Sequence, residues 1–450
     1  MNARLRIVAG LRRELSDWRL WLARAVVIAL AAAAGLTVVA FTWLTEHALA
    51  LFRGARTQWW WLPLLVTPLI TAAIVWLTRR FAPGAAGSGI PQVMAALDPA
   101  VPSAQRGLFV SLRLTLAKVV LTAAGLLGGL SLGREGPSVQ IAAGVMLSAR
   151  RWLPQRSAVT EQGLLVAGGA AGIAAAFNTP LGGVMFAIEE LSRRPEQRNS
   201  GLIIAAIVLA GLVAVSILGN GTYFGVIQVP ALDLALLGPG VLVALAGGVA
   251  GGLFSRLLIA SLSGRCADAP SRWRARRPVL FAAACGLAVA VIGIASGGTT
   301  FGSGYTYTRN MLEGSATTPV LDMLLKLVAT WLTAWSGVPG GIFAPALTIG
   351  ASLGKDIAVL TGYPHAPALI ALGMAAFLAA ATQAPLTAFI IVMEMVDGHQ
   401  MVLSLMACAL VASGISRLIG RPLYASLARA QLERLPAAPA TEAPPSPGRP

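Results

Sequence analysis

A charged dipeptide inside a long apolar stretch constrains this chain more than any other feature. Arg134 and Glu135 stand in the sequence SLGREGPSVQ, with LTLAKVVLTAAGLLGGL before it and IAAGVMLSA after it. Ionised side chains are costly at that depth in a membrane, so the pair must have a specific role. The flanking glycines permit a sharp turn, and Pro137 fits the first turn of a helix. The pattern predicts a helix, a break and a second helix whose free N–H groups attract anions.

The composition is that of an integral membrane protein. Of 450 residues, 56% are hydrophobic and 12% charged, whereas a soluble domain carries about a quarter charged residues. Apolar windows of about 20 residues recur from residue 26 to residue 417, the first of them over residues 26–44. Basic residues gather at the window ends, which is the positive-inside pattern and predicts cytoplasmic termini. The net charge of +16 therefore does not indicate nucleic-acid binding.

These basic clusters are Arg4, Arg6, Arg12 and Arg13; Arg150 and Arg151; Arg193 and Arg194; Arg272 to Arg277; and Arg417 and Arg421.

Sequence blocks recur in the same order at nearly constant spacing, which predicts a tandem duplication of about two hundred residues. The matches are Pro180 with Pro385 and Glu189 with Glu394 (385 − 180 = 205), Lys118 with Lys326 and GREGP with GIFAP (326 − 118 = 208), and GSGI with GSGY (302 − 87 = 215). We divide the chain into a cytoplasmic basic segment (1–24), two membrane repeats (25–230 and 231–432) and a Pro/Ala-rich tail (433–450) that is predicted to be disordered. Transporters usually place their site at the interface between such repeats.

Three breaks share one physical character: GSGIP (87–91), GREGP (133–137) and GIFAP (341–345). Each offers free N–H groups at a helix start, and Glu135 is the only acidic residue among them. Together with the Ser88 hydroxyl, they would coordinate a small anion without a formal positive charge, which allows fast release. Glycine and proline could instead merely kink packed helices. Three matched breaks at repeat-related places favour the anion site.

These loops, in this order, resemble the signature loops of the CLC family of chloride channels and chloride/proton antiporters. The segment AFNTPLGGVMFAIEE and the late PLY tyrosine fit as well, so the resemblance runs from about residue 19 to residue 432. It implies an all-α integral membrane protein with a CLC-type fold of two inverted-topology repeats of tilted, broken helices. It further implies a bacterial-type homodimer, with one pore per subunit and no C-terminal nucleotide-sensing domains, in the bacterial inner (plasma) membrane. The implied partners are chloride, protons and the lipid bilayer, with no cofactor, metal or nucleic acid.

The resemblance also assigns residues to a central chloride site. The implied chloride-binding set is Ser88, Gly89 and Ile90 of the first loop, Arg134 and Gly136 of the second, Ile342, Phe343 and Ala344 of the third, and Tyr424. A serine at position 88 favours chloride. Gln92 and Met94 depart from relatives that carry acidic residues after this loop.

Glu135 is implied to be the gate and proton carrier. Its carboxylate would occupy the place of a chloride ion and would swing out when protonated. An ion pair with Arg134 is the alternative, but neighbouring side chains at a helix start point in different directions. Arg134 is instead expected to stabilise the site electrostatically.

Glu190 matches the family's inner proton-transfer glutamate, and its presence favours antiport over a passive channel. Alternatively, it could pair with Arg193 or Arg194 at a helix end. Glu189 is expected to be supporting.

Lys118 would raise the positive potential near the anion loop, unless it snorkels to an interface. The repeat counterparts Glu394 and Lys326 are expected to be structural.

Two functions remain open: a proton-coupled chloride antiporter, and a passive chloride channel of the same fold gated by voltage or pH. Whether chloride flux moves protons distinguishes them. We expect no enzymatic activity, because the chain has neither HExxH nor GxSG. Its Gly-Lys pair, Gly354-Lys355, is followed by Asp356, so there is no P-loop, and its three cysteines lack metal or redox spacing.

Overall fold

The computed structural model describes residues 18–154, 159–192, 200–219, 221–226, 234–314 and 321–435. Within these ranges the regular structure is helical, and β-type pairing is limited to two isolated bridges. The basic residues before Trp18, the pair Arg193 and Arg194, and the tail from residue 436 lie outside the described residues.

The helices, in chain order, are α2 (Trp18–Gln58), α3 (Pro63–Phe81), α4 (Ile90–Ala96), α5 (Leu112–Leu127), α6 (Glu135–Leu147), α7 (Glu161–Phe177), α8 (Pro180–Phe186), α9 (Ser200–Leu218), α10 (Leu237–Ser263), α11 (Ala269–Arg276), α12 (Pro278–Ala295), α13 (Tyr305–Leu312), α14 (Asp322–Ser336), α15 (Phe343–Thr361), α16 (Ala366–Thr382), α17 (Pro385–Met395), α18 (Val402–Ile419) and α19 (Leu423–Leu432).

Eight helices in the described part of the chain are long and apolar enough to cross a membrane. The first window, predicted over residues 26–44, is longer in the structure: α2 has 41 residues and ends at Gln58. The exposed Trp59, Trp60 and Trp61 follow it directly, as expected for an aromatic belt at the membrane surface.

The two repeats are inverted relative to each other, and one pair of glycines shows it most directly. Gly133 and Gly341 are repeat counterparts, separated by the offset of 208 (341 − 133). Gly133 N donates to Gly341 O at 2.7 Å, and Gly341 N donates to Gly133 O at 2.8 Å, in an antiparallel bridge. When equivalent residues bond to each other reciprocally, the two-fold axis that relates the halves passes between them.

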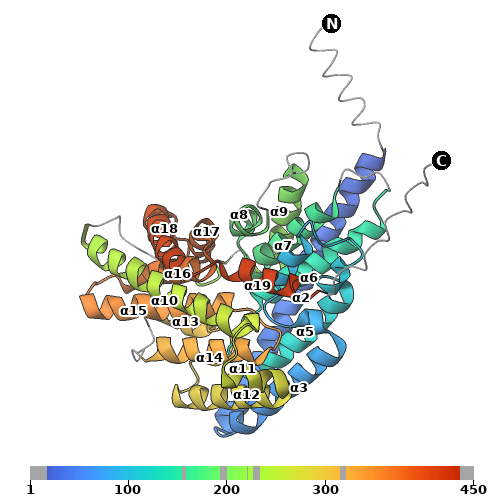
Figure 1. Ribbon diagram of the computed structural model, residues 1–450. Coiled ribbons are helices and arrows are strands. Elements are labelled where there is room, and N and C mark those ends of the chain that lie inside the picture. The colour runs from blue at the N-terminus through green and yellow to red at the C-terminus, as the bar shows by residue number, and fades with distance from the viewer. Residues whose placement is uncertain are drawn as a thin grey trace, which may run out of the picture.

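A second reciprocal contact joins α8 and α17, which lie side by side (Figure 1). Glu394, at the end of α17, accepts bonds from Leu181 N at 3.1 Å and Gly182 N at 2.7 Å, at the start of α8. Glu189 accepts from Leu386 N at 3.1 Å and Thr387 N at 2.7 Å, at the start of α17. Each carboxylate thus satisfies helix N–H groups that have no acceptor within their own helix. The sequence expectation that Glu394 is structural is consistent with this contact.

The centre of the molecule is formed by α6, α7, α15 and α16, whose residues are almost all buried. The pairs α6–α7 and α15–α16 correspond in the two repeats, and each packs along its length. Small residues allow this close packing: a side chain at Gly350 would collide with Gly373 O, and one at Gly354 with Leu369 O. Lipid gives helices no hydrophobic drive to associate, so such backbone contact is what holds membrane helices together. The second and third sequence breaks stand at the starts of α6 and α15 and so belong to this centre.

Candidate functional site

The three predicted breaks meet at one place. Gly87 in the first loop pairs with the third loop, through Gly87 N to Val338 O at 3.3 Å and Gly340 N to Gly87 O at 3.1 Å. The Gly133–Gly341 bridge joins the second loop to the third. The sequence predicted each break separately, and the structure brings their backbones into one hydrogen-bonded layer.

The first loop depends on a glycine that no other residue could replace. Gly89 caps α4 with φ of +110°, and a side chain there would also collide with Gly136 O. The close approach of α4 to α6 therefore requires both an unusual backbone angle and the absence of a Cβ atom. Gln92 closes the loop, because its Oε1 accepts from Gly89 N at 2.9 Å and its Nε2 donates to Ala86 O. An acidic residue could not make the second bond, so the departure at Gln92 has a structural role here.

Lys118 binds the backbone carbonyls at the start of the same loop. Its side chain is 0% exposed, and Nζ donates to Ala85 O at 2.7 Å and Gly87 O at 2.6 Å. Lys118 therefore does not snorkel to an interface. Its counterpart Lys326 makes the equivalent bonds in the other repeat, to Thr300 O at 2.9 Å and Gly302 O at 2.8 Å.

Glu135 starts α6 and is completely buried, at 0% exposure. Its carboxylate lies beside Gly133 and the start of α15: a Cβ atom at Gly133 would collide with Glu135 Oε2 and would be 3.2 Å from Ala344 Cβ. It lies near the N–H groups of Arg134 and Ala344, yet neither oxygen has a hydrogen-bond partner of ordinary geometry among the described residues. This carboxylate stands at a place built from helix N-termini.

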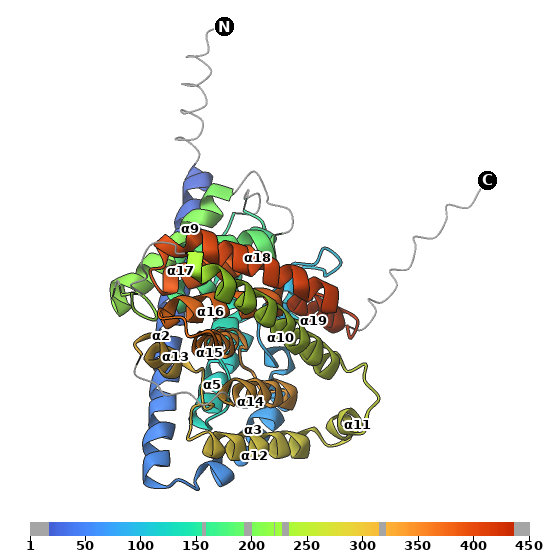
Figure 2. The same ribbon diagram turned by 90° about the vertical axis from the view of Figure 1, so that its left-hand side faces the viewer.

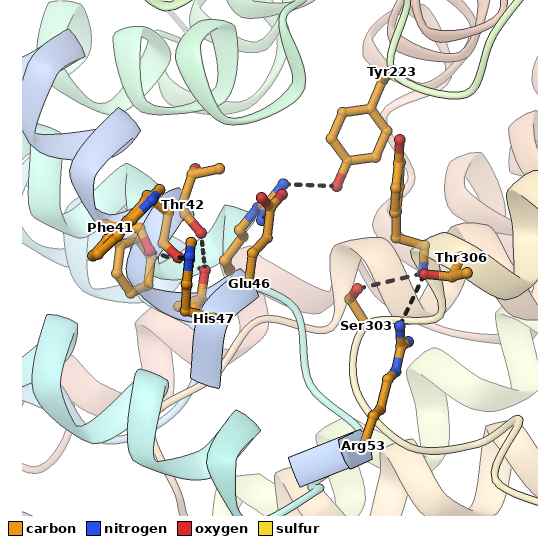
Figure 3. A network of polar contacts seen from close by, with 12 residues as sticks. Phe41, Thr42, Glu46, His47, Arg53, Tyr223, Ser303 and Thr306 are labelled. Atoms are coloured by element: carbon orange, nitrogen blue, oxygen red, sulfur yellow. Dashed lines mark hydrogen bonds and ion pairs between the residues drawn. The ribbon is translucent and has the colours of Figure 1, made fainter. Parts of the chain in front are cut away.

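Arg134 does not form an ion pair with Glu135. Its Nη1 donates to Glu46 Oε1 at 2.7 Å, and its Nη2 to Tyr223 Oη at 3.3 Å. Figure 3 shows Glu46 and Tyr223 facing each other across this contact. The Arg134 side chain is 11% exposed and the Glu46 side chain is 56% exposed. This ion pair therefore extends from the buried site to the surface of the protein.

Sequence reasoning missed Glu46 and Tyr223. Glu46 is the only acidic residue of α2, and an acid inside a spanning helix is a signal that could have identified it. The predicted first window ended at residue 44 and left it outside. Tyr223 carries no such signal, since it lies in a loop and reaches Arg134 only through the fold.

The third break and the C-terminal tyrosine complete the site. Ile342 caps α15, and Phe343 and Ala344 are its first residues, all of them buried. The ring of Phe343 lies 5.5 Å from that of Phe177. Tyr424, at the start of α19, is 1% exposed, and its hydroxyl lies close to Ser88 Oγ.

Within the described part of the chain, three of these side chains carry buried polar atoms without a hydrogen-bond partner. The hydroxyl of Ser88, both carboxylate oxygens of Glu135 and the hydroxyl of Tyr424 are buried without a hydrogen-bond partner in the described structure. Buried polar atoms are normally paired. Several unpartnered hydroxyls elsewhere, such as that of Ser413, lie inside helices, whereas an added Cβ at Gly136 would lie against Ser88 Oγ and one at Gly133 against Glu135 Oε2, both near the start of α6. Such a cluster offers hydroxyl donors to an anion and one carboxylate that competes with it.

Glu189 and Glu190 lie in a π-helical turn over Ala187–Leu191 that follows α8. Turns of this kind are frequent at functional sites. The carboxylate of Glu189 caps α17, as described above, while Glu190 is half-buried and close enough to Tyr424 to interact with it electrostatically. The alternative partners Arg193 and Arg194 lie outside the described residues.

Comparison with known proteins identifies relatives over most of the chain. The sequence model of a family described as "voltage gated chloride channel" matches residues 69–417. The H(+)/Cl(-) exchange transporter ClcA of Cronobacter sakazakii is 32% identical, over 88% of this chain and 86% of its own length. A slow cyanobacterial Cl-/H+ antiporter superposes with a TM-score of 0.77 at 24% identity, covering 92% of this chain and 98% of its own. A CLC-type fluoride/proton antiporter gives 0.73 at 24% identity, covering 90% and 97%.

The two buried lysines allow a matched test of the loops. Lys118→Met should remove both bonds to the first loop, and Lys326→Met both bonds to its counterpart. Each should lower the melting temperature in detergent, since hydrogen bonds from a charged donor contribute about 1.5–3 kcal/mol. Only Lys118→Met should also weaken chloride binding in calorimetry, by roughly tenfold, because only the first loop carries Ser88. Equal loss of chloride binding in both variants would contradict a specific role for Lys118.

Proposed function

The chain belongs to the CLC family of voltage-gated chloride channels and transporters, and we propose that it is a chloride/proton antiporter. The observation that carries this proposal is the position of Glu135, whose buried carboxylate stands where the helix N-termini and the hydroxyls of Ser88 and Tyr424 would hold an anion. One place that suits both a chloride ion and a titratable carboxylate couples the movement of the two ions.

Chloride is bound by neutral groups in this proposal. The Ser88 and Tyr424 hydroxyls and the backbone N–H groups of Ile342 and Phe343 act as donors, with Gly89, Ile90, Gly136 and Ala344 shaping the backbone around them. Lys118 and Arg134 lie behind this layer, engaged with carbonyls or with Glu46. They therefore raise the local potential without contacting the ion, and binding without a formal counter-charge permits release.

Glu135 is the proposed gate. Ionised, its carboxylate competes with chloride for the N-termini of α6 and α15. Protonated, it loses its charge and with it the attraction to the helix ends, so it moves aside and admits chloride. The same side chain thereby takes up a proton from one side of the membrane.

Glu190 is the proposed inner proton acceptor. It is half-buried, and it is close enough to Tyr424 to interact with the chloride site electrostatically. Glu189 is engaged with the start of α17 and supports the turn rather than carrying protons. We infer that both termini lie in the cytoplasm from the basic residues at the span ends.

A homodimer is part of the proposal, and a surface formed by α8, α9, α17 and α18 supports it. Leu181 and Leu386, at the N-termini of α8 and α17, are exposed on this surface beside the carboxylates that cap those helices. Polar, irregular backbone is not tolerated against lipid unless protein covers it. Exposed side chains of α9 and α18, such as Leu212 and Leu403, extend the apolar surface that a second copy would bury.

The gate is tested with Glu135→Gln in proteoliposomes, with chloride efflux and bath pH recorded together. The amide cannot be deprotonated, so chloride should move while proton uptake falls to background. Glu313→Gln, an exposed carboxylate paired with Arg309, is the control and should stay coupled. Proton uptake retained in Glu135→Gln would exclude Glu135 as the carrier.

Adjacent carboxylates give a matched test of the inner acceptor. Glu190→Gln should stop proton movement while chloride flux persists, because the proton loses its inner acceptor. Glu189→Gln makes the same chemical change one residue away and should stay coupled, though with a lower melting temperature. Full coupling in Glu190→Gln would make that residue structural.

Chloride flux without proton movement in the unmodified protein would instead identify a passive channel.

The dimer is tested by tryptophan substitution on the same surface. Leu181→Trp combined with Leu403→Trp should shift the detergent-solubilised protein from twice the chain mass to the chain mass in light scattering. Leu116→Trp combined with Leu280→Trp, two exposed positions on α5 and α12, should leave the mass unchanged. A monomeric unmodified protein would contradict the proposed assembly.

A further inference from the structure

A cavity lined by several arginines lies away from the Glu135 site. Its volume is about 580 Å³, and its walls come from the ends of α3, α10 and α14, from α11 and from the residues after α19. Figure 2 shows α11 at the edge of the molecule, between α10 and α12. Cavities of 300–1,000 Å³ are the usual size for organic ligands, whereas a single chloride ion would leave most of this space unfilled.

Four arginines line the cavity: Arg79, Arg272, Arg274 and Arg434. Among the described residues, no aspartate, glutamate or histidine lines it. Nearby carboxylates are engaged elsewhere: Glu433 binds Arg265 at 2.7 Å, and Asp268 caps α11 by accepting from Ser271 N at 3.4 Å. The hydrogen bond from Arg265 lowers the pKa of Glu433, so this carboxylate stays ionised on its own partner.

Two of the guanidinium groups are held in place by backbone carbonyls at the end of α10. Arg274 Nη1 donates to Ser261 O at 3.2 Å, and Arg434 Nη2 donates to Ser263 O at 2.8 Å. A guanidinium has five N–H donors, so these bonds leave most of them for another partner. Burial lowers the pKa of Arg274, and the charges of Arg434 and Arg79 lower it further. The charge of Arg274 is therefore repelled by those of Arg434 and Arg79.

An arrangement of this kind is stabilised by a multivalent anion. Guanidinium groups are weakly hydrated and bind phosphate oxygens in a bidentate manner. The arginines come from α3, from α11 and from the residues after α19, so an anion with several charged oxygens can contact more than one of them. The basic segment Arg272 to Arg277 also assigns this face to the cytoplasm, where phosphorylated compounds and anionic lipid headgroups are both present.

We propose that this cavity is a binding site for a phosphate-bearing anion, held by Arg79, Arg272, Arg274 and Arg434. The site adjoins the chloride-site scaffold, since Ala86 and Gly337 are part of its wall. Ala86 comes directly before the first loop (87–91), and Gly337 comes shortly before the third loop (341–345). A bound anion therefore rests against the back of both loops. The proposal does not depend on proton coupling.

The test is calorimetric titration of the purified full-length protein in detergent with inorganic pyrophosphate, at constant ionic strength and chloride concentration. Saturable binding is expected. Arg272→Gln combined with Arg274→Gln should weaken it by roughly tenfold or more, since charged hydrogen bonds contribute about 1.5–3 kcal/mol. Arg276→Gln combined with Arg277→Gln removes the same charge from the same segment but from outside the cavity, and should bind normally.

Chloride binding, measured in the same preparations, verifies that each variant is folded, and Arg79→Gln gives a second cavity variant on another helix. Equal weakening by the cavity and control pairs would overturn the proposal, because the effect would then be general charge screening. Citrate binding as tightly as pyrophosphate would overturn the assignment to phosphate. Absence of saturable binding to a folded protein would overturn the site.

Nanodiscs identify the source of the phosphate group. If phosphatidylglycerol discs suppress pyrophosphate binding relative to phosphatidylcholine discs, and Arg272→Gln with Arg274→Gln abolishes that difference, a lipid headgroup occupies the site. If binding is equal in both discs, the ligand is a soluble phosphate compound. Either result supports the proposal.

Discussion

The bridge between Gly133 and Gly341 is the contact on which the site depends. Two peptide groups from opposite repeats satisfy each other, so two helix starts can be brought together inside a membrane without exposing their backbones to lipid. The chain gains from this a cluster of N–H groups and hydroxyls that its own backbone positions. Glu135 is placed by the same contact, because its carboxylate lies between the start of its own helix and that of α15.

The cations around this site are arranged to act at a distance. Lys118 is engaged with backbone carbonyls and Arg134 with Glu46 and Tyr223. A cation in direct contact would hold a halide tightly and slow its release. Positive charge one layer away lowers the cost of bringing an anion to mid-membrane while it leaves the contacts weak. The cavity lined by Arg79, Arg272, Arg274 and Arg434 is the opposite case, because there the guanidinium groups themselves face the space, as the proposed binding of a multivalent anion requires.

The sequence predicted what is encoded locally. Glycine and proline marked the three breaks, and the constant offsets between Pro180 and Pro385 and between Lys118 and Lys326 predicted the duplication. Contacts between distant segments were not accessible in this way. Arg134 and Glu46 are 88 residues apart, and nothing in either neighbourhood indicates the other. The roles of Glu394 and Gln92 likewise became clear only when the helix starts that they cap were in place. Inversion of the repeats followed from the family resemblance and not from counting spans, whereas in the structure it follows from two pairs of reciprocal bonds.

The exchanged caps of α8 and α17 have a consequence for how the protein is made. Until Glu394 has been synthesised and inserted, the N–H groups of Leu181 and Gly182 lack their acceptor, and those at the start of α17 depend in turn on Glu189. The first half leaving the ribosome therefore cannot complete its own structure in the bilayer. Biogenesis has to keep that half protected, by the translocation machinery or by neighbouring helices, until the second half arrives.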